Sequence, residues 1–185
     1  MIDLNGVDFA EKVVKVFNNG VGGKVDNVTI KVEKKSLDGH VNAPDYNVVF
    51  TDSEGASASA GFYYEGSEQI LISRALHVGR AVLGAEYKFP PAENTKDALN
   101  KIMKLIKDNS EGKLFNTFCT YGNANYKPSQ YLNIRYFDFI EPADVENTRL
   151  RLKAGDLLEK VAQDAPSTPS GSKSNTSLAD EDDWV

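Results

Sequence analysis

The sequence predicts an α+β domain followed by a disordered acidic tail. Several stretches between residues 27 and 141 alternate apolar and polar side chains, as half-buried strands do. Two other stretches repeat apolar residues every three or four positions, which is the spacing of amphipathic helices. After Val161 this periodicity stops, and a run rich in Ser, Pro, Thr, Gly and Asn follows. We therefore expect one domain over residues 1–163 and a tail over residues 164–185.

The first part of the domain is expected to contain a helix, a strand and a hairpin. Residues 8–18 have helical spacing of apolar side chains, and a glycine-rich run then ends this helix. Residues 27–35 switch to a period of two, which predicts a half-buried strand. Residues 45–52 and 56–64 are rich in strand-forming side chains and flank the turn sequence Asp52-Ser53-Glu54-Gly55. They predict a hairpin.

Two helices are expected in the middle of the domain. Residues 68–83 place four apolar side chains along one stripe, and Gly84 follows as a C-terminal signal. The stripe consists of Leu71, Ala75, Val78 and Val82. Residues 96–108 carry a similar stripe after Thr95, which is the candidate N-cap. Both helices are therefore expected to bury one face.

The last part of the domain is expected to contain two strands and a short helix. The strands cover residues 113–121 and 130–141, and a loop at residues 122–129 separates them. A final helix is expected at residues 155–163. The strand at residues 130–141 is long enough to bend around a barrel. Five bent antiparallel strands with flanking helices fit a five-stranded antiparallel OB-like barrel, which is the fold we predict.

The composition is that of an ordinary globular chain, with 41% hydrophobic and 26% charged residues among 185. A domain of about 160 residues buries roughly 70% of its unfolded surface, so it needs neither a metal nor a disulfide to form a core. The only cysteine, Cys119, cannot close an intramolecular disulfide, and no Cys/His set has zinc spacing. We expect no cofactor and no bound metal.

The cellular location is expected to be cytoplasmic. The N-terminal residues lack the basic start and apolar run of a signal peptide, and no segment approaches 18 uninterrupted apolar residues. A lone cysteine also suits a reducing compartment. The sequence therefore predicts neither secretion nor a membrane partner.

The net charge of −6 by itself disfavours binding to nucleic acid. The charge is not evenly distributed, however, because the tail holds five acidic residues and one lysine. Residues 1–163 are left with 22 acidic and 20 basic residues. A locally basic groove in the domain remains compatible with this balance.

Catalytic patterns are weak throughout the chain, and we expect no enzyme activity. His40 and His77 are more typical of surface or core histidines than of bases, and Cys119 lies in the middle of an expected strand. The run of glycines before Lys24 does not have the spacing of a phosphate-binding loop. The acidic residues are scattered, which disfavours a two-metal site.

Binding chemistry is better represented, on the strand expected at residues 130–141. One face carries Leu132, Ile134, Tyr136 and Ile140, and the other carries Tyr131, Asn133, Arg135, Phe137 and Phe139. If the first face lies on the core, the second offers rings and a guanidinium for stacking on single-stranded nucleic acid. The alternative is a central strand whose second face is covered by helices. Both interpretations stay open for Tyr131 and Arg135, whereas core is favoured for Phe137 and Phe139.

The candidate nucleic-acid contacts are aromatic and basic residues on these strands and on the loop before them. They are Tyr131, Arg135, Tyr126, Lys127 and Tyr121, with Lys31, Lys34 and Lys35 as weaker electrostatic contributors. Lysine clusters of this kind are also typical of a solvated face, which is the alternative for the last three.

The end of the chain resembles a known design. After a Ser/Pro/Gly linker the last six residues are Asp180, Glu181, Asp182, Asp183, Trp184 and Val185. The chain is similar in this respect to the single-stranded-DNA-binding proteins of bacteria and phages, which join an OB barrel to a disordered acidic tail with an aromatic or apolar tip. The bacterial proteins usually end in Phe after Pro, where this chain has Trp184 and Val185.

The resemblance implies sequence-independent binding and protection of single-stranded DNA in phage or bacterial DNA replication and recombination. It implies that the acidic tail competes with DNA for the groove. When DNA displaces the tail, residues 180–185 would recruit replication or recombination proteins. A phage-encoded protein of this kind would work in the host cytoplasm, and a homo-oligomer is compatible with the family.

Two other functions are kept beside this one. A free C-terminal Trp184-Val185 is suited to a PDZ-type groove, which would make the chain a non-enzymatic adaptor or a virion structural protein. A small hydrolase would instead need a pocket of converging titratable groups. The discriminating feature is a surface in the domain that combines tyrosines with basic residues, because only the DNA-binding function requires one.

Overall fold

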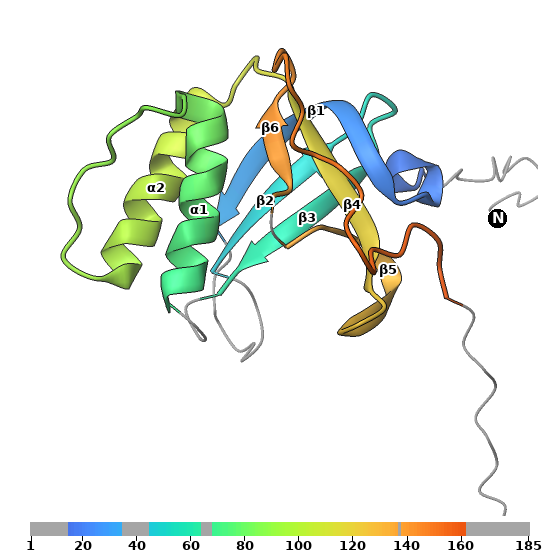
Figure 1. The fold of residues 1–185 in the computed structure, drawn as a ribbon. Helices are drawn as coiled ribbons and strands as arrows, with labels where there is room; N and C mark the ends of the chain where they lie inside the picture. Colours follow the sequence, from blue (N-terminus) through green and yellow to red (C-terminus); the bar gives the residue numbers. More distant parts are fainter. Residues whose placement is uncertain (1–14, 35–44, 64–67, 137, 162–185) are drawn as a thin grey trace, which may run out of the picture.

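The strands form one open antiparallel sheet of six strands, in the order β3-β2-β1-β4-β5, with β6 also paired to β4 (Figure 1). The computed structural model describes residues 15–34, 45–63, 68–136 and 138–161. The strands are β1 (Gly23–Lys34), β2 (Tyr46–Thr51), β3 (Ser57–Phe62), β4 (Phe115–Asn123), β5 (Lys127–Ile134) and β6 (Ile140–Pro142). The predicted strands at residues 27–35, 45–52, 56–64 and 113–121 are thus confirmed within a few residues.

The long strand β1 connects two parts of the sheet. Its second half pairs with β2, from Thr29 to Lys34, whereas its first half pairs with β4. The register shifts between Val25 and Val28, and Asn27 adopts a positive φ of 57° at this irregularity. Such a bulge bends a strand and increases its twist. The bent sheet brings Cα atoms of β3 and β5 within 8 Å of each other.

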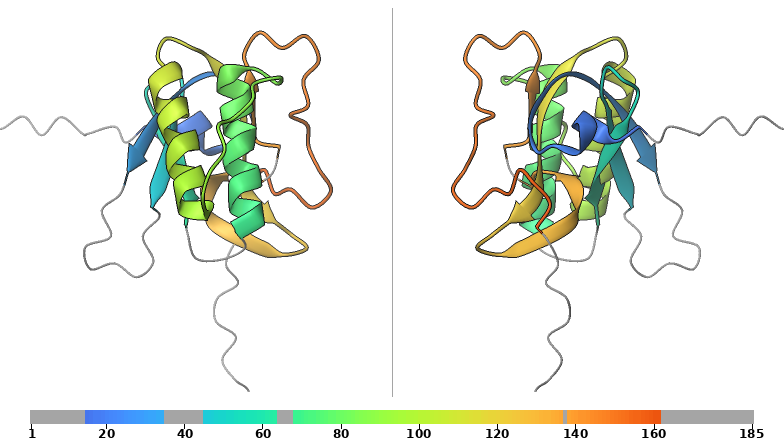
Figure 2. Two further views of the ribbon diagram at one scale, coloured as in Figure 1. Left: turned by 90° about the vertical axis from the view of Figure 1, so that its left-hand side faces the viewer. Right: turned by 90° about the vertical axis from the view of Figure 1, so that its right-hand side faces the viewer.

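Among the described residues, β3 and β5 form no hydrogen-bonded ladder with each other, so the sheet is open between these two strands. The predicted five-stranded barrel is corrected accordingly to an open sheet of six strands. The helices on one side of the sheet are α1 (Glu68–Leu83) and α2 (Thr95–Asn109), as both views of Figure 2 show. No helix among the described residues is long and apolar enough to cross a membrane.

The two helices follow the sequence pattern closely. The predicted bounds of α1 are confirmed, and all four side chains of its predicted stripe are buried. The start of α2 differs from the prediction, because Asn94 is the N-cap and accepts a hydrogen bond from the Asp97 N–H at 2.9 Å. Asn94 has the extended backbone that an N-cap requires, whereas Thr95 is already helical.

The core lies between the helices and the inner face of the sheet. Its largest fully buried side chains are aromatic and come mainly from the strands: Phe50, Phe62, Phe115 and Phe139. From the helices, Val78 of α1 and Leu99 and Ile106 of α2 are completely enclosed. The prediction that both helices bury one face is therefore confirmed.

The C-terminal part differs most from the prediction. The strand expected at residues 130–141 is interrupted, because β5 ends at Ile134 and β6 begins at Ile140. Asp138 has a positive φ of 47° in this interval, which strand geometry does not allow. The helix expected at residues 155–163 is also wrong within the described residues. There the chain is extended beside β4, with bonds from the Tyr121 N–H to the Leu157 carbonyl at 2.7 Å and from the Leu157 N–H to the Gly122 carbonyl at 3.1 Å.

The helix expected at residues 8–18 lies mostly outside the described residues. The part that is described ends in a short 3₁₀ turn at Phe17–Gly20, in which Asn18 and Asn19 have positive φ values. Asparagine tolerates this conformation better than most residues. The tail at residues 164–185 lies outside the described part of the chain.

Arg74 of α1 connects the two sides of the opening in the sheet. Its Nη1 donates to the Gly61 carbonyl of β3 at 3.0 Å, and its Nε donates to the Tyr136 carbonyl after β5, also at 3.0 Å. The side chain is only 7% exposed. Burial lowers the pKa of Arg74 to about 10, so the guanidinium stays charged at neutral pH. These bonds satisfy carbonyl groups that a closed ladder would otherwise occupy.

We predict that Arg74→Ala lowers the free energy of unfolding by about 2 to 4 kcal/mol. The change removes two charge-assisted hydrogen bonds and leaves the two carbonyl acceptors without a donor. The matched control is Arg80→Ala on the same helix, since Arg80 is exposed and should change stability by less than about 0.5 kcal/mol. Urea unfolding followed by circular dichroism measures both values. Equal stability of the two variants would contradict this role of Arg74.

Candidate nucleic-acid interface

The outer face of β5 exposes Tyr131. Leu132 packs against the core and Ile134 is buried, so the strand alternation directs Tyr131 and Asn133 toward solvent. Tyr131 is 78% exposed, which is far more than a ring in a covered strand would be. Its backbone is fixed by a hydrogen bond from its N–H to the Ser129 hydroxyl at 3.1 Å. The ring is therefore accessible and attached to an ordered strand.

Tyr126 stands at the tip of the turn between β4 and β5 and is 90% exposed. Asn123 holds this turn, because its side-chain oxygen accepts from the Asn125 N–H at 2.9 Å and its carbonyl accepts from the Tyr126 N–H at 3.1 Å. Lys127 follows as the first residue of β5, in register with Asn123. Tyr126 and Tyr131 are five residues apart, which is at most about 17 Å along an extended chain.

Arg135 has internal partners instead. Its Nη1 donates to the Asp156 carboxylate at 3.0 Å and its Nη2 to the Asp138 carbonyl at 2.7 Å, and the side chain is 7% exposed. The guanidinium also lies 4.1 Å from the centroid of the Phe118 ring. Arg135 thus attaches the C-terminal segment to the sheet, and we leave it out of the proposed interface. Of the two interpretations left open for Arg135, the structure shows a covered side chain, because the strand alternation ends at Ile134.

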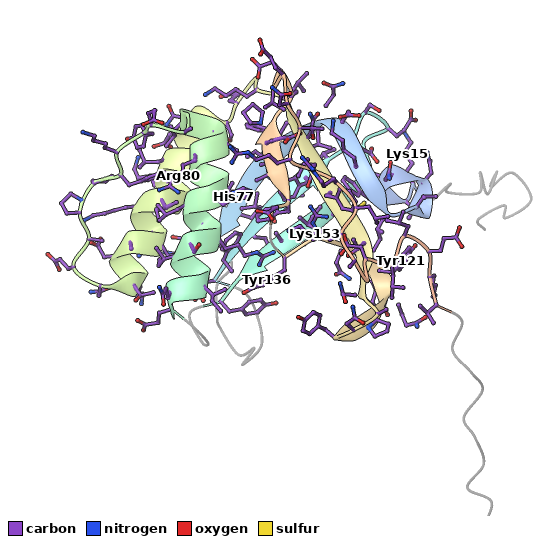
Figure 3. The ribbon with its side chains drawn as sticks, viewed as in Figure 1. Lys15, His77, Arg80, Tyr121, Tyr136 and Lys153 are labelled. Carbon is purple, nitrogen blue, oxygen red and sulfur yellow. The ribbon has the colours of Figure 1, made fainter. Side chains whose placement is uncertain are left out.

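Tyr121 likewise serves the structure. It is buried, and its hydroxyl donates to the Gly20 carbonyl at 2.7 Å. This bond joins the end of β4 to the turn that precedes β1. Figure 3 labels the position of Tyr121 in the sheet. A base cannot stack on a ring enclosed in this way, so Tyr121 also stays outside the interface that we propose.

The predicted lysines lie on another part of the sheet. Lys31 and Lys34 are exposed on the half of β1 that pairs with β2, and β4 separates β1 from β5. Lys31 is 3.4 Å from a Glu33 oxygen, and the Lys34 Nζ is 5.9 Å from the centroid of the Tyr46 ring. The structure therefore does not place them directly beside Tyr131. Lys35 and residues 180–185 lie outside the described residues.

Sequence reasoning overlooked two residues at the opening between β3 and β5. Tyr136 was expected to face the core with Ile134, yet its side chain is 49% exposed. Arg74 was not recognised at all. A signal for it existed, since an arginine between Leu71 and Val78 falls on the buried stripe of α1, where an unpaired cation would be costly.

A separate hollow of about 680 Å³ lies between the C-terminal half of α1 and residues 138–150. Its walls are mostly apolar, and His77, Arg80 and Arg149 contribute the basic groups. Figure 3 shows His77 and Arg80 on the same helix. The His77 Nε2 is buried and has no hydrogen-bond partner in the described part of the chain.

The chemistry of this hollow is limited. The residues that line it include no serine, cysteine or lysine, so His77 has no nucleophile to activate there. The carboxylate of Glu141 accepts from the Thr148 hydroxyl and from the Arg149 N–H, and Asp138 pairs with Lys153. Among the described residues, no three His, Cys, Asp or Glu side chains gather as metal ligands. In the ranges that the structure describes, the hollow thus offers neither a nucleophile–base pair nor a set of metal ligands.

We predict that the free energy of unfolding decreases as the pH falls from about 7.5 to about 5.5, and that the titration of His77 causes part of this decrease. Burial is the main cause that lowers the pKa of His77, so below its ordinary value of 6.5 the unfolded chain takes up a proton that the folded protein does not. The contribution of neutral His77 to the free energy of unfolding is complete above pH 6.5. It is lost as the pH falls through the lower pKa that His77 has in the folded protein.

Urea unfolding at the two pH values tests this expectation. The variant His77→Gln should lose less stability on acidification than the parent chain, and His40→Gln serves as the matched histidine control. The same loss in the parent chain and in His77→Gln would contradict the assignment.

Comparison with known proteins identifies no relative. No protein-family model matches the sequence, and neither a curated protein nor a solved structure matches the chain. Arguments about function therefore rest on the residues and on the geometry described above.

Proposed function

We propose that this protein binds single-stranded DNA without sequence preference and has no catalytic role. The observation that carries the proposal is the exposure of Tyr131 on β5 and of Tyr126 on the adjoining turn. Aromatic rings on a strand and its loop offer stacking surfaces to successive bases, and every base has a face that can stack. Protection of single strands during DNA replication and recombination is the role that suits such a surface.

The strand order supports the proposal through the fold. The central strand β1 pairs with both β2 and β4, and β3 and β5 face each other across the opening. We interpret this as a partly open barrel of the OB type, with both helices in the connection between β3 and β4. Barrels of that type bind oligonucleotides partly through the loop between their fourth and fifth strands. Tyr126 lies on the corresponding turn here.

The place where the tail leaves the domain supports a regulatory part of the proposal. The Gln130 side chain donates to the Val161 carbonyl at 3.4 Å, and Gln130 is the neighbour of Tyr131 on β5. A linker of about 19 residues spans on the order of 25 Å when it behaves as a flexible coil. The acidic residues Asp180 to Asp183 can therefore compete with DNA at β5 and, once displaced, bind replication or recombination proteins.

We expect Tyr131→Ala and Tyr126→Ala each to weaken DNA binding by about 5- to 150-fold, because stacking contributes about 1 to 3 kcal/mol per base. Fluorescence anisotropy of a labelled dT oligonucleotide measures the change. The matched control is Tyr87→Ala, since Tyr87 is also exposed but belongs to the segment that connects α1 to α2. Equal affinities of the parent chain and of both β5-region variants would reject this surface.

A chain that ends at Ala179 tests the tail. We expect it to bind the oligonucleotide more tightly than the whole chain at low salt, because the competing carboxylates are gone. The difference should shrink as salt screens the tail. Absence of binding by either form would remove the nucleic-acid function and would favour an adaptor that uses Trp184 and Val185.

A further inference from the structure

The guanidinium of Arg74 is held rigidly where the sheet is open. Its hydrogen bonds to the Gly61 and Tyr136 carbonyls use two different nitrogen atoms, so they fix the orientation of the group as well as its position. Its carbon Cζ lies 5.2 Å from the ring centroids of both Phe62 and Phe139. Arg74 therefore has little freedom to move or to reach a ligand.

The same guanidinium supports the ring of Tyr136. The distance from Arg74 Cζ to the Tyr136 ring centroid is 4.1 Å, which is a close cation–π contact. Arg74 thus contacts both the backbone and the side chain of this one residue. Even so, 49% of the Tyr136 side chain is exposed. Figure 3 shows Tyr136 near the ends of β3 and α1.

We infer that Tyr136, backed by Arg74, is a further stacking platform that takes an unpaired base of a bound single strand. This inference rests on the proposed function. A ring that is already fixed loses little conformational freedom when a base stacks on it, so more of the stacking free energy remains for binding. Bases in a duplex have their faces covered, so the platform selects single strands.

The platform lies within reach of the same strand of nucleic acid as Tyr131. The two tyrosines are five residues apart, so at most about 17 Å of chain separates them. Single-strand sites on barrels of this type cover about 4 to 16 nucleotides. One bound strand can therefore contact Tyr131 on β5 and Tyr136 beyond its end.

Arg74 is a positioning residue in this proposal and does not touch phosphate. Its Nε and Nη1 are used by protein carbonyls and its side chain is 7% exposed. A stacking contribution is independent of counterion release, whereas each phosphate contact with a single strand adds about 0.7 to the slope of log affinity against log salt. The salt dependence of binding therefore separates the two roles.

The first experiment compares Tyr136→Leu with Tyr136→Phe by anisotropy of a labelled dT oligonucleotide at several salt concentrations. Tyr136→Leu removes the ring and should weaken binding by about 5- to 150-fold, with the salt slope unchanged. Tyr136→Phe keeps the ring and should bind like the parent chain. Neither change removes the backbone carbonyl that Arg74 needs.

The second experiment is a double-mutant cycle with Arg74→Lys, which preserves the charge but not the planar stack. If Arg74 acts through Tyr136, Arg74→Lys should weaken DNA binding in the parent chain and have little effect in Tyr136→Leu. A merely structural role would weaken binding equally in both backgrounds. Circular dichroism confirms that each variant is folded.

The outcomes separate this inference from the proposed function. Unchanged affinity of Tyr136→Leu, in a chain that loses binding with Tyr131→Ala, overturns the platform and leaves the proposed function standing. A salt slope reduced by about 0.7 in Tyr136→Leu also overturns it, since the loss would then come from a phosphate contact. No binding by the parent chain rejects the proposed function itself.

Discussion

A sheet that does not close leaves the backbone groups of its end strands without ladder partners, and the rest of this structure depends on how that gap is filled. Arg74 fills it from α1 by donating to carbonyls on both sides, one in β3 and one after β5. The helix, the two ends of the sheet and the ring of Tyr136 are thereby tied to one cation. Arg74 thus supplies two of the donors that a β3–β5 ladder would otherwise provide. Arg135 makes a separate connection, from the residue after β5 to the Asp156 carboxylate of the C-terminal segment.

The elements that were predictable from sequence are those stabilised by local pattern. The stripe of α1 follows from helical periodicity, and the hairpin of β2 and β3 follows from strand-forming residues on both sides of a turn sequence. The only local signal of the interruption between Ile134 and Ile140 is Asp138, a charged residue on the otherwise apolar face of Leu132 and Ile134. The interruption itself is imposed by distant partners of Arg135 and by the backbone of Asp138. The extended segment near Leu157 is likewise determined by its bonds to β4, which override any helical preference.

The candidate site shows the same division. Strand alternation indicates that Tyr131 and Leu132 face opposite ways, and turn residues are generally exposed, so Tyr131 and Tyr126 were accessible to sequence reasoning. The enclosure of Tyr121 was not, because its partner Gly20 lies 101 residues away. The sequence alone does not distinguish a tyrosine whose ring is buried from one whose ring is exposed and available for stacking. Only the tertiary partners distinguish these two roles.

The C-terminal segment beside β4 also has a mechanical consequence. Residues 155–158 are bonded at several points to β4 and to Gly22, and Arg135 clamps Asp156 within the same stretch. A displacement of residues 155–158 therefore has to break these bonds to β4 and to Gly22 before it can disturb the core. The last described segment of the domain is consequently held to β4, to the residue before β1 and to a buried arginine at once, so it cannot separate from the sheet one contact at a time.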